Sequence, residues 1–265
     1  MTTSDTPSAP LGAVYAGDAY RDLVIVVTGA GSGIGRGLAR WFARHGAHVV
    51  AGDINTAAVQ QNVDEIVAAG GDARAETVDI ASPTSVAAFR DSVAATEGRC
   101  DVLVNNAGWE DIRPFTDTDR AFWDKITSIN LIGPIAVSAA FLPMMIEQGG
   151  ASVVNIASDA GRVGSTGETV YAAAKGGVIA FTKSLAREAA RHQIVVNAVC
   201  PGPTDTPAFA RVPERLQQAL IRAIPLRRVA DVEDVAHVVG FFASPHSRYL
   251  TGQAVSVSGG LTMVD

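Results

Sequence analysis

The chain has 265 residues, of which 48% are hydrophobic and 18% are charged, and its formal net charge is −6. This composition is too apolar for a disordered chain, and the length fits one large domain or two small ones. No run of Lys and Arg forms a basic stripe, which argues against a nucleic-acid partner. We also find no apolar run that we expect to span a membrane.

The beginning of the chain has neither the basic segment nor the apolar core of a secretory signal. We therefore expect a disordered or extended tail over residues 1–20, followed by a catalytic domain over residues 21–265. Cys100 and Cys200 lie beside predicted strand ends, which predicts buried free thiols in a cytoplasmic protein. The five histidines show no zinc-ligand spacing, so we expect no metal site.

Short apolar runs alternate with segments of helical periodicity along the chain. The apolar runs predict strands at 23–28, 47–53, 75–80, 101–108, 151–158, 194–202 and 253–260. The periodic segments predict helices at 33–45, 56–69, 83–97, 120–148, 169–191 and 232–243. Buried strands alternating with helices indicate an α/β fold, a doubly wound seven-stranded parallel sheet of the Rossmann type in a single domain.

One segment, residues 204–226, interrupts this alternation. It contains three prolines and a short amphipathic stretch, and it follows a predicted strand. Long insertions at the carboxyl end of a strand commonly carry function. We predict that this segment is a substrate lid.

The first predicted strand runs directly into the glycine-rich stretch "TGAGSGIG", Thr28 to Gly35. Glycine permits a tight turn and a close approach of the backbone to a ligand, and the N-terminus of the following helix favours phosphate groups. A glycine-rich turn alone is weak evidence, but a strand before it and a helix after it strengthen the pattern. The stretch predicts a dinucleotide-binding turn.

Asp53 ends the second predicted strand, 18 residues after the glycine turn. A carboxylate there can bind both ribose hydroxyls and repels a 2′-phosphate, so the sequence favours NAD over NADP. The alternative is that Asp53 caps the helix beginning near Asn55. Arg36, Arg40 and Arg44 share one helix face, which is either solvated, as the pattern favours, or a clamp for a 2′-phosphate.

Two further candidates follow the third and fourth predicted strands. Asp79 either accepts a hydrogen bond from the adenine amino group or serves as a turn residue, and the spacing leaves both open. The "NNAG" stretch at 105–108 ends the next strand. Ligands of open α/β sheets bind at this carboxyl edge, so both belong to the predicted nucleotide site.

Ser158 ends the fifth predicted strand, and Tyr171 lies at the beginning of the next helix, with Lys175 one turn later on the same face. A free tyrosine titrates near pH 10, and a nearby ammonium lowers that pKa. We predict that Tyr171 exchanges a proton with a secondary alcohol while Ser158 stabilises charge on the same oxygen. Tyr-x-x-x-Lys alone arises by chance on many helices, whereas the combination with the glycine turn and Asp53 is specific.

These motifs, together with Asn130 and "PGP" at 201–203, resemble the short-chain dehydrogenase/reductase family in its shorter single-domain branch. The resemblance implies a nicotinamide-dependent oxidoreductase that interconverts a secondary alcohol and a ketone. It implies the catalytic residues Asn130, Ser158, Tyr171 and Lys175, with Asn130 supporting a water that leads from the lysine to solvent. It also implies homotetramers joined through helices near 120–148 and 170–191.

The motifs and the resemblance together predict an extended cofactor site. The expected NAD contacts are Gly29, Ser32, Gly33, Ile34, Gly35, Asp53, Ile54, Asp79, Ile80, Asn106, Ala107, Gly108, Tyr171, Lys175, Pro201, Gly202, Thr204 and Thr206. Relatives that prefer NADP tend to carry a basic residue where this chain has Ser32 or Ile54, which strengthens the prediction of NAD.

The substrate pocket is expected around Trp109, Ala160, Arg162, Val163 and Glu168, together with the lid. Small residues and one tryptophan suit a ring or a short acyl group.

Within the family, the chain most resembles 2-hydroxycyclohexanecarboxyl-CoA dehydrogenases, and related branches reduce 3-oxoacyl thioesters. Arg162, Arg211 and Arg215 either contact CoA phosphates or are surface charges or subunit contacts, and the pattern favours the latter two. A free alicyclic or aryl alcohol remains an alternative substrate, and a non-catalytic NAD-sensing protein is a distant alternative function.

Overall fold

The computed structural model describes residues 20–264 and contains one seven-stranded sheet, in which all strands are parallel in the order β3-β2-β1-β4-β5-β6-β7. The strands are β1 (Val24–Thr28), β2 (His48–Asp53), β3 (Asp72–Thr77), β4 (Val102–Asn105), β5 (Ala151–Ile156), β6 (Ile194–Pro201) and β7 (Ala254–Val257). This confirms the predicted Rossmann-type α/β domain.

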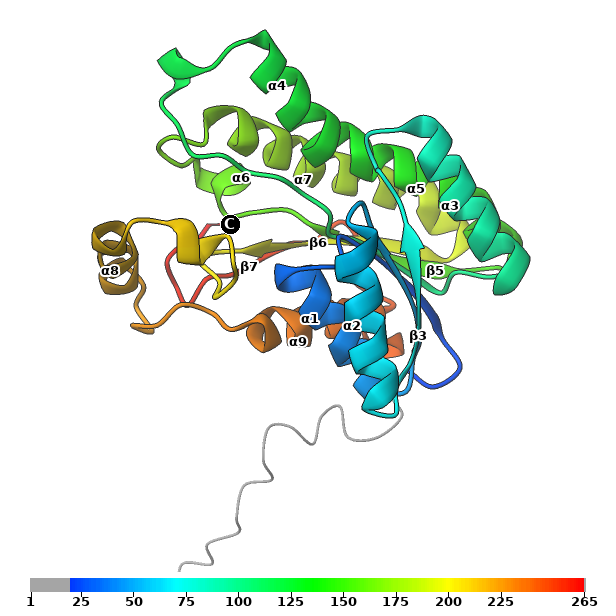
Figure 1. Ribbon diagram of the computed structural model, residues 1–265. Helices are drawn as coiled ribbons and strands as arrows, with labels where there is room; N and C mark the ends of the chain where they lie inside the picture. The colour runs from blue at the N-terminus through cyan, green and yellow to red at the C-terminus, as the bar shows by residue number, and fades with distance from the viewer. Residues whose placement is uncertain (1–19, 265) are drawn as a thin grey trace, which may run out of the picture.

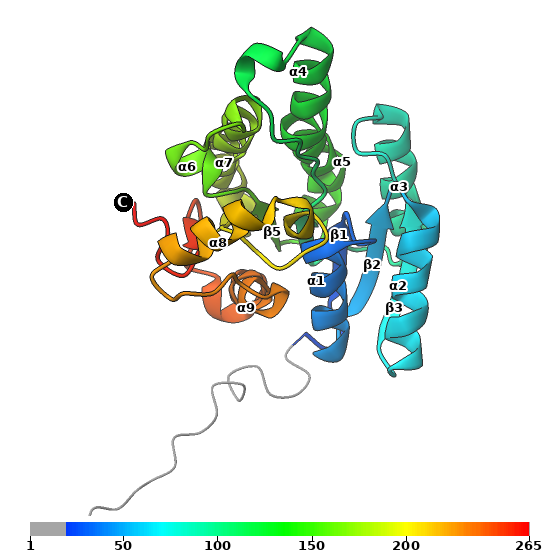
Figure 2. The same cartoon turned by 60° about the vertical axis from the view of Figure 1, so that its left-hand side comes forward.

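Helices cover both faces of the sheet (Figure 1 and Figure 2). They are α1 (Gly33–Arg44), α2 (Thr56–Ala68), α3 (Pro83–Thr96), α4 (Arg120–Thr127), α5 (Gly133–Glu147), α6 (Ala160–Val163), α7 (Thr169–Ala189), α8 (Glu214–Ala223) and α9 (Val232–Ala243). One core cluster joins the sheet to α1, α2 and α9, and a second joins it to α3, α5 and α7. Successive side chains of β1 alternate between the two clusters, as the two-residue period of a strand requires.

The strand order reverses at β1, which pairs with β2 on one side and β4 on the other. The carboxyl end of β1 touches the loop that follows β4, because the Ala107 amide donates to the Thr28 hydroxyl over 3.1 Å. A crevice between diverging loops at this point is where open α/β sheets bind ligands. The fold therefore gathers the predicted site residues at one edge of the sheet.

Several predicted elements differ from the structure, and strands β4 and β7 are both shorter than the predicted 101–108 and 253–260. Strand β3 covers Asp72–Thr77 rather than 75–80, because it is a sheet edge with little buried surface and no continuous apolar run marks its beginning. The predicted helix at 120–148 is divided into α4 and α5 by a π-helical turn, Ser128–Ile132. This turn contains Asn130, whose side chain donates to the Ile126 carbonyl over 3.0 Å.

The expected tail falls almost wholly on residues 1–19, which lie outside the described residues. Tyr20, placed in that tail by the prediction, is fully buried and packs edge-on against Trp41 and Phe42. The folded part of the chain therefore includes Tyr20. Cys100 and Cys200 are buried free thiols, as predicted.

The expectation that no segment is apolar enough to span a membrane was wrong on length and composition. The continuous helical run Arg120–Glu147 is long and apolar enough to cross a membrane by length and composition. In the structure, 39% of its most apolar window is buried. Its residues Val137, Phe141 and Met145 are fully enclosed in the core, which is the arrangement of a helix in a globular domain. Ile132 and Ile146 on the same run are exposed.

Candidate active site

The glycine turn after β1 has a backbone shape that side chains would prevent. Gly29 and Gly33 have φ angles of +69° and +52°, and a methyl group on Gly35 would overlap the Gly29 carbonyl oxygen. Asn106 braces the turn from the neighbouring loop, since its amide donates to the Thr28 carbonyl over 2.9 Å. The turn therefore has a fixed shape and ends at the N-terminus of α1.

Asp53 lies at the carboxyl end of β2 and is joined to this turn. One carboxylate oxygen accepts the Gly31 amide over 2.8 Å, and the other accepts the Asn55 amide over 2.8 Å. The cap of α2 is Asn55, whose side chain accepts the Ala58 amide, so the alternative reading of Asp53 as the cap was wrong. The carboxylate is held beside the glycine turn, where a ribose would lie.

The three arginines of α1 are each matched by an acid. Arg36 and Arg40 both pair with Glu65, the former over 2.8 Å, and Arg44 pairs with Glu233 over 3.1 Å. This is the solvated, ion-paired face that the sequence favoured. Since three arginines share two acids, one positive charge on this face is not balanced by an ion-pair partner among residues 20–264, and a 2′-phosphate would compete with Glu65 and Glu233 for the arginines.

The remaining predicted cofactor residues follow the same edge of the sheet. Asp79 closes a turn after β3 by accepting the Ala81 amide over 2.9 Å, so the turn role is present and the adenine contact stays a prediction. Ile54 is exposed, whereas Ile80 is buried against Gly133. Thr206 approaches the glycine turn from the loop after β6, 3.7 Å from where a methyl group on Gly33 would lie.

Three more of the predicted cofactor residues lie at the end of β6 or directly after it. The Pro201 carbonyl, at the end of β6, accepts the Asp159 amide over 3.1 Å. Thr204 is buried and its hydroxyl donates to the Gly202 carbonyl over 3.0 Å. The contacts of these residues with a cofactor remain predictions.

Ser158, Tyr171 and Lys175 converge in the cleft. Ser158 follows β5, and its side chain lies near enough to Tyr171 to lower the pKa of that phenol. The Lys175 ammonium lies 5.7 Å from the centre of the Tyr171 ring and donates to the Ile156 carbonyl over 2.8 Å. The structure thus brings the three predicted side chains together.

The pKa values differ from the sequence-based expectation. Burial raises the pKa of Tyr171 above its ordinary value, the carboxylates of Glu110 and Glu168 raise it further, and only the hydrogen bond from Ser158 opposes this. Burial also lowers the pKa of Lys175 to about 8. The expectation that Lys175 lowers the pKa of Tyr171 is therefore not met by the protein alone, because the ammonium is itself poorly solvated and points at a carbonyl.

Asn130 fixes the loop that follows β4. Its side-chain oxygen accepts the Trp109 amide over 3.1 Å, and its nitrogen donates to the Trp109 carbonyl over 2.7 Å. A methyl group on Gly108 would lie 3.0 Å from the Asn130 oxygen and 3.6 Å from the Lys175 nitrogen. Asn130 and Lys175 therefore meet around Gly108, while the predicted water remains a prediction.

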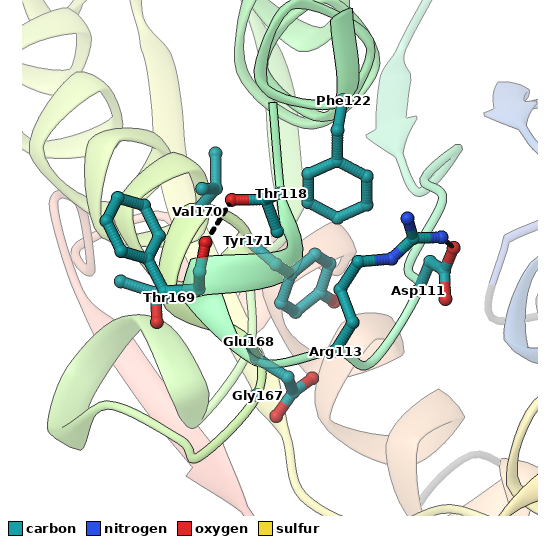
Figure 3. Close-up of a pocket in the computed structure, with 10 residues that line it drawn as sticks. Asp111, Arg113, Thr118, Phe122, Gly167, Glu168, Thr169, Val170 and Tyr171 are labelled. Carbon is teal, nitrogen blue, oxygen red and sulfur yellow. Dashed lines mark hydrogen bonds and ion pairs between the residues drawn. The ribbon is translucent and has the colours of Figure 1, made fainter. Parts of the chain in front are cut away.

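A small pocket opens beside Tyr171, between the loop after β4 and the start of α7 (Figure 3). Its lining residues are Asp111, Arg113, Phe115, Thr118, Phe122, Gly167, Glu168, Thr169, Val170 and Tyr171. The Arg113 amide donates to the Gly167 carbonyl over 3.0 Å, which ties the two walls together. Of the predicted substrate residues, the pocket includes Glu168.

The other predicted substrate residues lie in different surroundings. The Trp109 ring is covered by the Lys125 ammonium at 3.7 Å. Ala160 is buried and Val163 is exposed. Arg162 donates to the Ser256 hydroxyl over 2.9 Å and to the Val264 carbonyl over 3.1 Å, so it binds the C-terminal segment.

The sequence did not point to Glu110 as a site residue, and it did not reveal the structural role of Thr28. Glu110 influences Tyr171 and Lys175 electrostatically, and the Thr28 hydroxyl joins the loops of β1 and β4. The signal for Glu110 was its position two residues after Gly108, at the carboxyl edge of the sheet. Thr28 was visible as the polar residue that ends a buried strand.

The lowered pKa of Lys175 predicts a pH-dependent stability. Between about pH 8 and 10.5 the unfolded chain binds a proton that the folded protein does not, so the free energy of unfolding rises with pH. Lys175→Met removes this dependence. In urea titrations, the stability of the wild type relative to this variant should rise by about 3 kcal/mol across that window.

The exposed Lys183 on the same helix supplies the control. Lys183→Met should leave the difference from wild type constant over this pH range. A constant difference for Lys175→Met as well would contradict the desolvated lysine.

Comparison with known proteins places this geometry in a family. A family profile described as "Enoyl-(Acyl carrier protein) reductase" matches residues 29–262. The chain is 38% identical over 240 residues to 3-oxoacyl-[acyl-carrier-protein] reductase FabG of Thermotoga maritima, covering 91% of this chain and 98% of that protein. It is 37% identical over 252 residues to human (3R)-3-hydroxyacyl-CoA dehydrogenase, covering 92% and 97%.

Solved structures agree. A putative short-chain alcohol dehydrogenase from Sinorhizobium meliloti superposes with a TM-score of 0.87 at 33% identity, covering 92% of this chain and 98% of that one. A 7α-hydroxysteroid dehydrogenase complexed with NADH and 7-oxo glycochenodeoxycholic acid superposes with a TM-score of 0.88 at 32% identity, covering 92% and 96%. The chain belongs to the short-chain dehydrogenase/reductase family of oxidoreductases.

Proposed function

We propose that this protein is an NAD-dependent dehydrogenase that interconverts a secondary alcohol and a ketone. The observation that carries the proposal is the convergence of Ser158, Tyr171 and Lys175 at the carboxyl edge of the sheet, next to the glycine turn. The NADH in the 7α-hydroxysteroid dehydrogenase structure supports a nicotinamide cofactor here. The positive-φ glycines and the tied Asp53 fit its pyrophosphate and ribose.

Each catalytic side chain has a task in ketone reduction. Tyr171 donates its hydroxyl proton to the carbonyl oxygen as that oxygen gains negative charge. Ser158 accepts the Ala160 amide over 3.1 Å and can donate its hydroxyl hydrogen to the same oxygen. A bound nicotinamide cofactor supplies the hydride for reduction, or a hydride acceptor and a positive charge beside Tyr171 for oxidation.

Lys175 and Asn130 support this proton transfer. Lys175 would hold the nicotinamide ribose, and its pKa of about 8 lets it gain and lose a proton near neutral pH. Asn130 holds the Trp109 backbone beside Lys175, which keeps the adjoining wall of the cleft in place.

The substrate is an alcohol or ketone on a ring or a 3-hydroxyacyl chain, with CoA linkage as one form. The names of two relatives, a 3-oxoacyl reductase and a 3-hydroxyacyl-CoA dehydrogenase, support the acyl form. A free alicyclic or aryl alcohol is the alternative, favoured by the engagement of Arg162 with the C-terminal segment rather than with open solvent. The convergence of all four catalytic residue types disfavours a non-catalytic NAD sensor.

The loop after β6 and α8 form the proposed substrate lid. Figure 1 shows α8 at the left-hand edge of the molecule, apart from α6. The Leu226 amide donates to the Gly259 carbonyl over 3.1 Å, which anchors the far end of the lid to the last strand. Deleting residues 208–223 should raise KM for ketones more than KM for NADH, and an unchanged ketone KM would contradict the lid.

We further propose a cytoplasmic homotetramer that acts on small molecules rather than on nucleic acid or membranes. The exposed apolar residues Ile132 and Ile146 on the long α4–α5 run support an interface there, and the buried free thiols suit a reducing compartment. Ile132→Glu should reduce the mass in sedimentation equilibrium. A monomeric wild type would contradict the oligomer, and recovery in the membrane or periplasmic fraction would contradict the location.

The activity is tested by following NADH absorbance with cyclic alcohols, aryl alcohols, 3-hydroxyacyl-CoAs and the matching ketones. The wild type should turn over at least one of them. Tyr171→Phe removes the proton donor and should lower kcat by about 10² to 10⁴-fold while NADH still binds. Unchanged turnover in this variant would contradict the mechanism, and no wild-type turnover would contradict the activity.

The cofactor preference is tested with Asp53→Ala. Losing the carboxylate removes two ribose hydrogen bonds and the repulsion of a 2′-phosphate, so kcat/KM for NAD should fall and the NAD to NADP preference should narrow by roughly tenfold or more. Asp64→Ala, on the exposed face of α2, is the matched control. A wild type that prefers NADP would contradict the assignment of NAD.

A further inference from the structure

We propose that Glu110 and Glu168 are specificity-determining residues that favour ketones and alcohols uncharged near the reacting carbon over those that carry a carboxylate there. The inference rests on the proposed function and refines its substrate class. It predicts that the enzyme accepts an ester or thioester of a 3-oxo acid and discriminates against the free acid.

The two carboxylates come from different loops that are tied together. Glu110 follows β4, and Glu168 precedes the first turn of α7. The loops meet where the Arg113 amide donates to the Gly167 carbonyl and where Gly167 packs against Ile112. The two acid-bearing loops are therefore held together, and Glu168 lines the pocket that Tyr171 borders.

Neither carboxylate is neutralised by an ion pair within residues 20–264. The neighbouring Arg113 pairs with Asp111 and lies over the Phe122 ring at 4.7 Å. Its ion pair is therefore with Asp111 and not with Glu110 or Glu168. Glu168 lines the pocket that Tyr171 borders (Figure 3). A substrate in the cleft thus meets uncompensated negative charge on this wall.

The charges that face Tyr171 come from every adjoining element. Glu110 and Glu168 are negative, Lys175 on α7 is positive, and Ser158 after β5 contributes a hydrogen bond. Arg211 on the lid influences Glu110 from across the cleft, but it is the weakest of the groups that act on that carboxyl. The charged groups that raise the pKa of Tyr171 are thus both carboxylates.

The electrostatic influence of the two acids agrees with the joined loops that carry them. Burial raises the pKa of Glu110, and Glu168 raises it further, although Glu110 is exposed as a whole residue. Both acids also raise the pKa of Tyr171. A carboxylate on the substrate would add a third negative charge to this cleft, and solvent would screen the repulsion only in part, because Glu168 is half-buried although Glu110 is exposed.

The test compares ethyl acetoacetate with acetoacetate, and ethyl 2-oxocyclohexanecarboxylate with its free acid. Each pair has the same reacting ketone and differs in one charge. The wild type should show a kcat/KM for the ester at least tenfold above that for the acid. Glu110→Gln and Glu168→Gln should each narrow that ratio by roughly three- to tenfold, since a full charge is replaced by an amide of the same shape.

Three variants serve as controls. Glu147→Gln removes an exposed carboxylate at the end of α5 and should leave the ratio unchanged. Glu110→Asp and Glu168→Asp keep the charge and should retain most of the discrimination. An ester-to-acid ratio that is equal in the wild type and the double glutamine variant would overturn the proposal.

A second readout does not need turnover. The ultraviolet absorbance of tyrosinate, taken as the difference between each protein and its Tyr171→Phe counterpart, reports the pH at which Tyr171 ionises. That pH should fall in the glutamine variants, and no fall would overturn the proposal. Absence of turnover with every ketone would instead count against the proposed function, because the titration still tests the two acids.

Discussion

A buried lysine beside a partly exposed tyrosine is the constraint on which the rest of the site depends. Lys175 is only 3% exposed, and its ammonium donates a hydrogen bond to the Ile156 carbonyl at the end of β5. Burying an ammonium is costly unless it is well partnered, and the lowered pKa of Lys175 expresses that cost. The stability lost here is consistent with a site organised for catalysis, where perturbed titrating groups are common.

The surrounding fold holds Lys175 and Tyr171 at the carboxyl edge of the sheet, where the cofactor is proposed to bind. The π-helical turn places Asn130 where it grips both polar groups of the Trp109 backbone, and Gly108 leaves room between Asn130 and Lys175. The Thr28 hydroxyl and the Asn106 amide join the glycine turn to the same loop. A few hydrogen bonds therefore connect the nucleotide side of the cleft to its catalytic side.

Much of this could be read from the sequence, because period and turn chemistry are local. The glycine turn, the serine before the tyrosine and the helical spacing of Tyr171 and Lys175 all depend on residues close together in the chain. The sign of the Tyr171 pKa could not be predicted, since it depends on Glu110, a residue 61 positions away whose approach is set by the tertiary packing of two loops. The π-helical turn was likewise hidden, because Asn130 in that turn bonds to Trp109 on another loop, a contact that local sequence patterns do not reveal.

These observations give Tyr171 two roles in proton transfer, as an acid and as a base. In the protein alone Tyr171 is held as an acid, ready for ketone reduction, and a positive charge beside it is needed before it can act as a base. The most direct test is the tyrosinate titration of Tyr171 in the free enzyme and with NAD⁺ or NADH bound. We predict that the ionisation pH lies above the ordinary value for tyrosine in the free enzyme, falls with NAD⁺ and does not fall with NADH. An ordinary value in the free enzyme, or the same fall with both forms of the cofactor, would contradict this account.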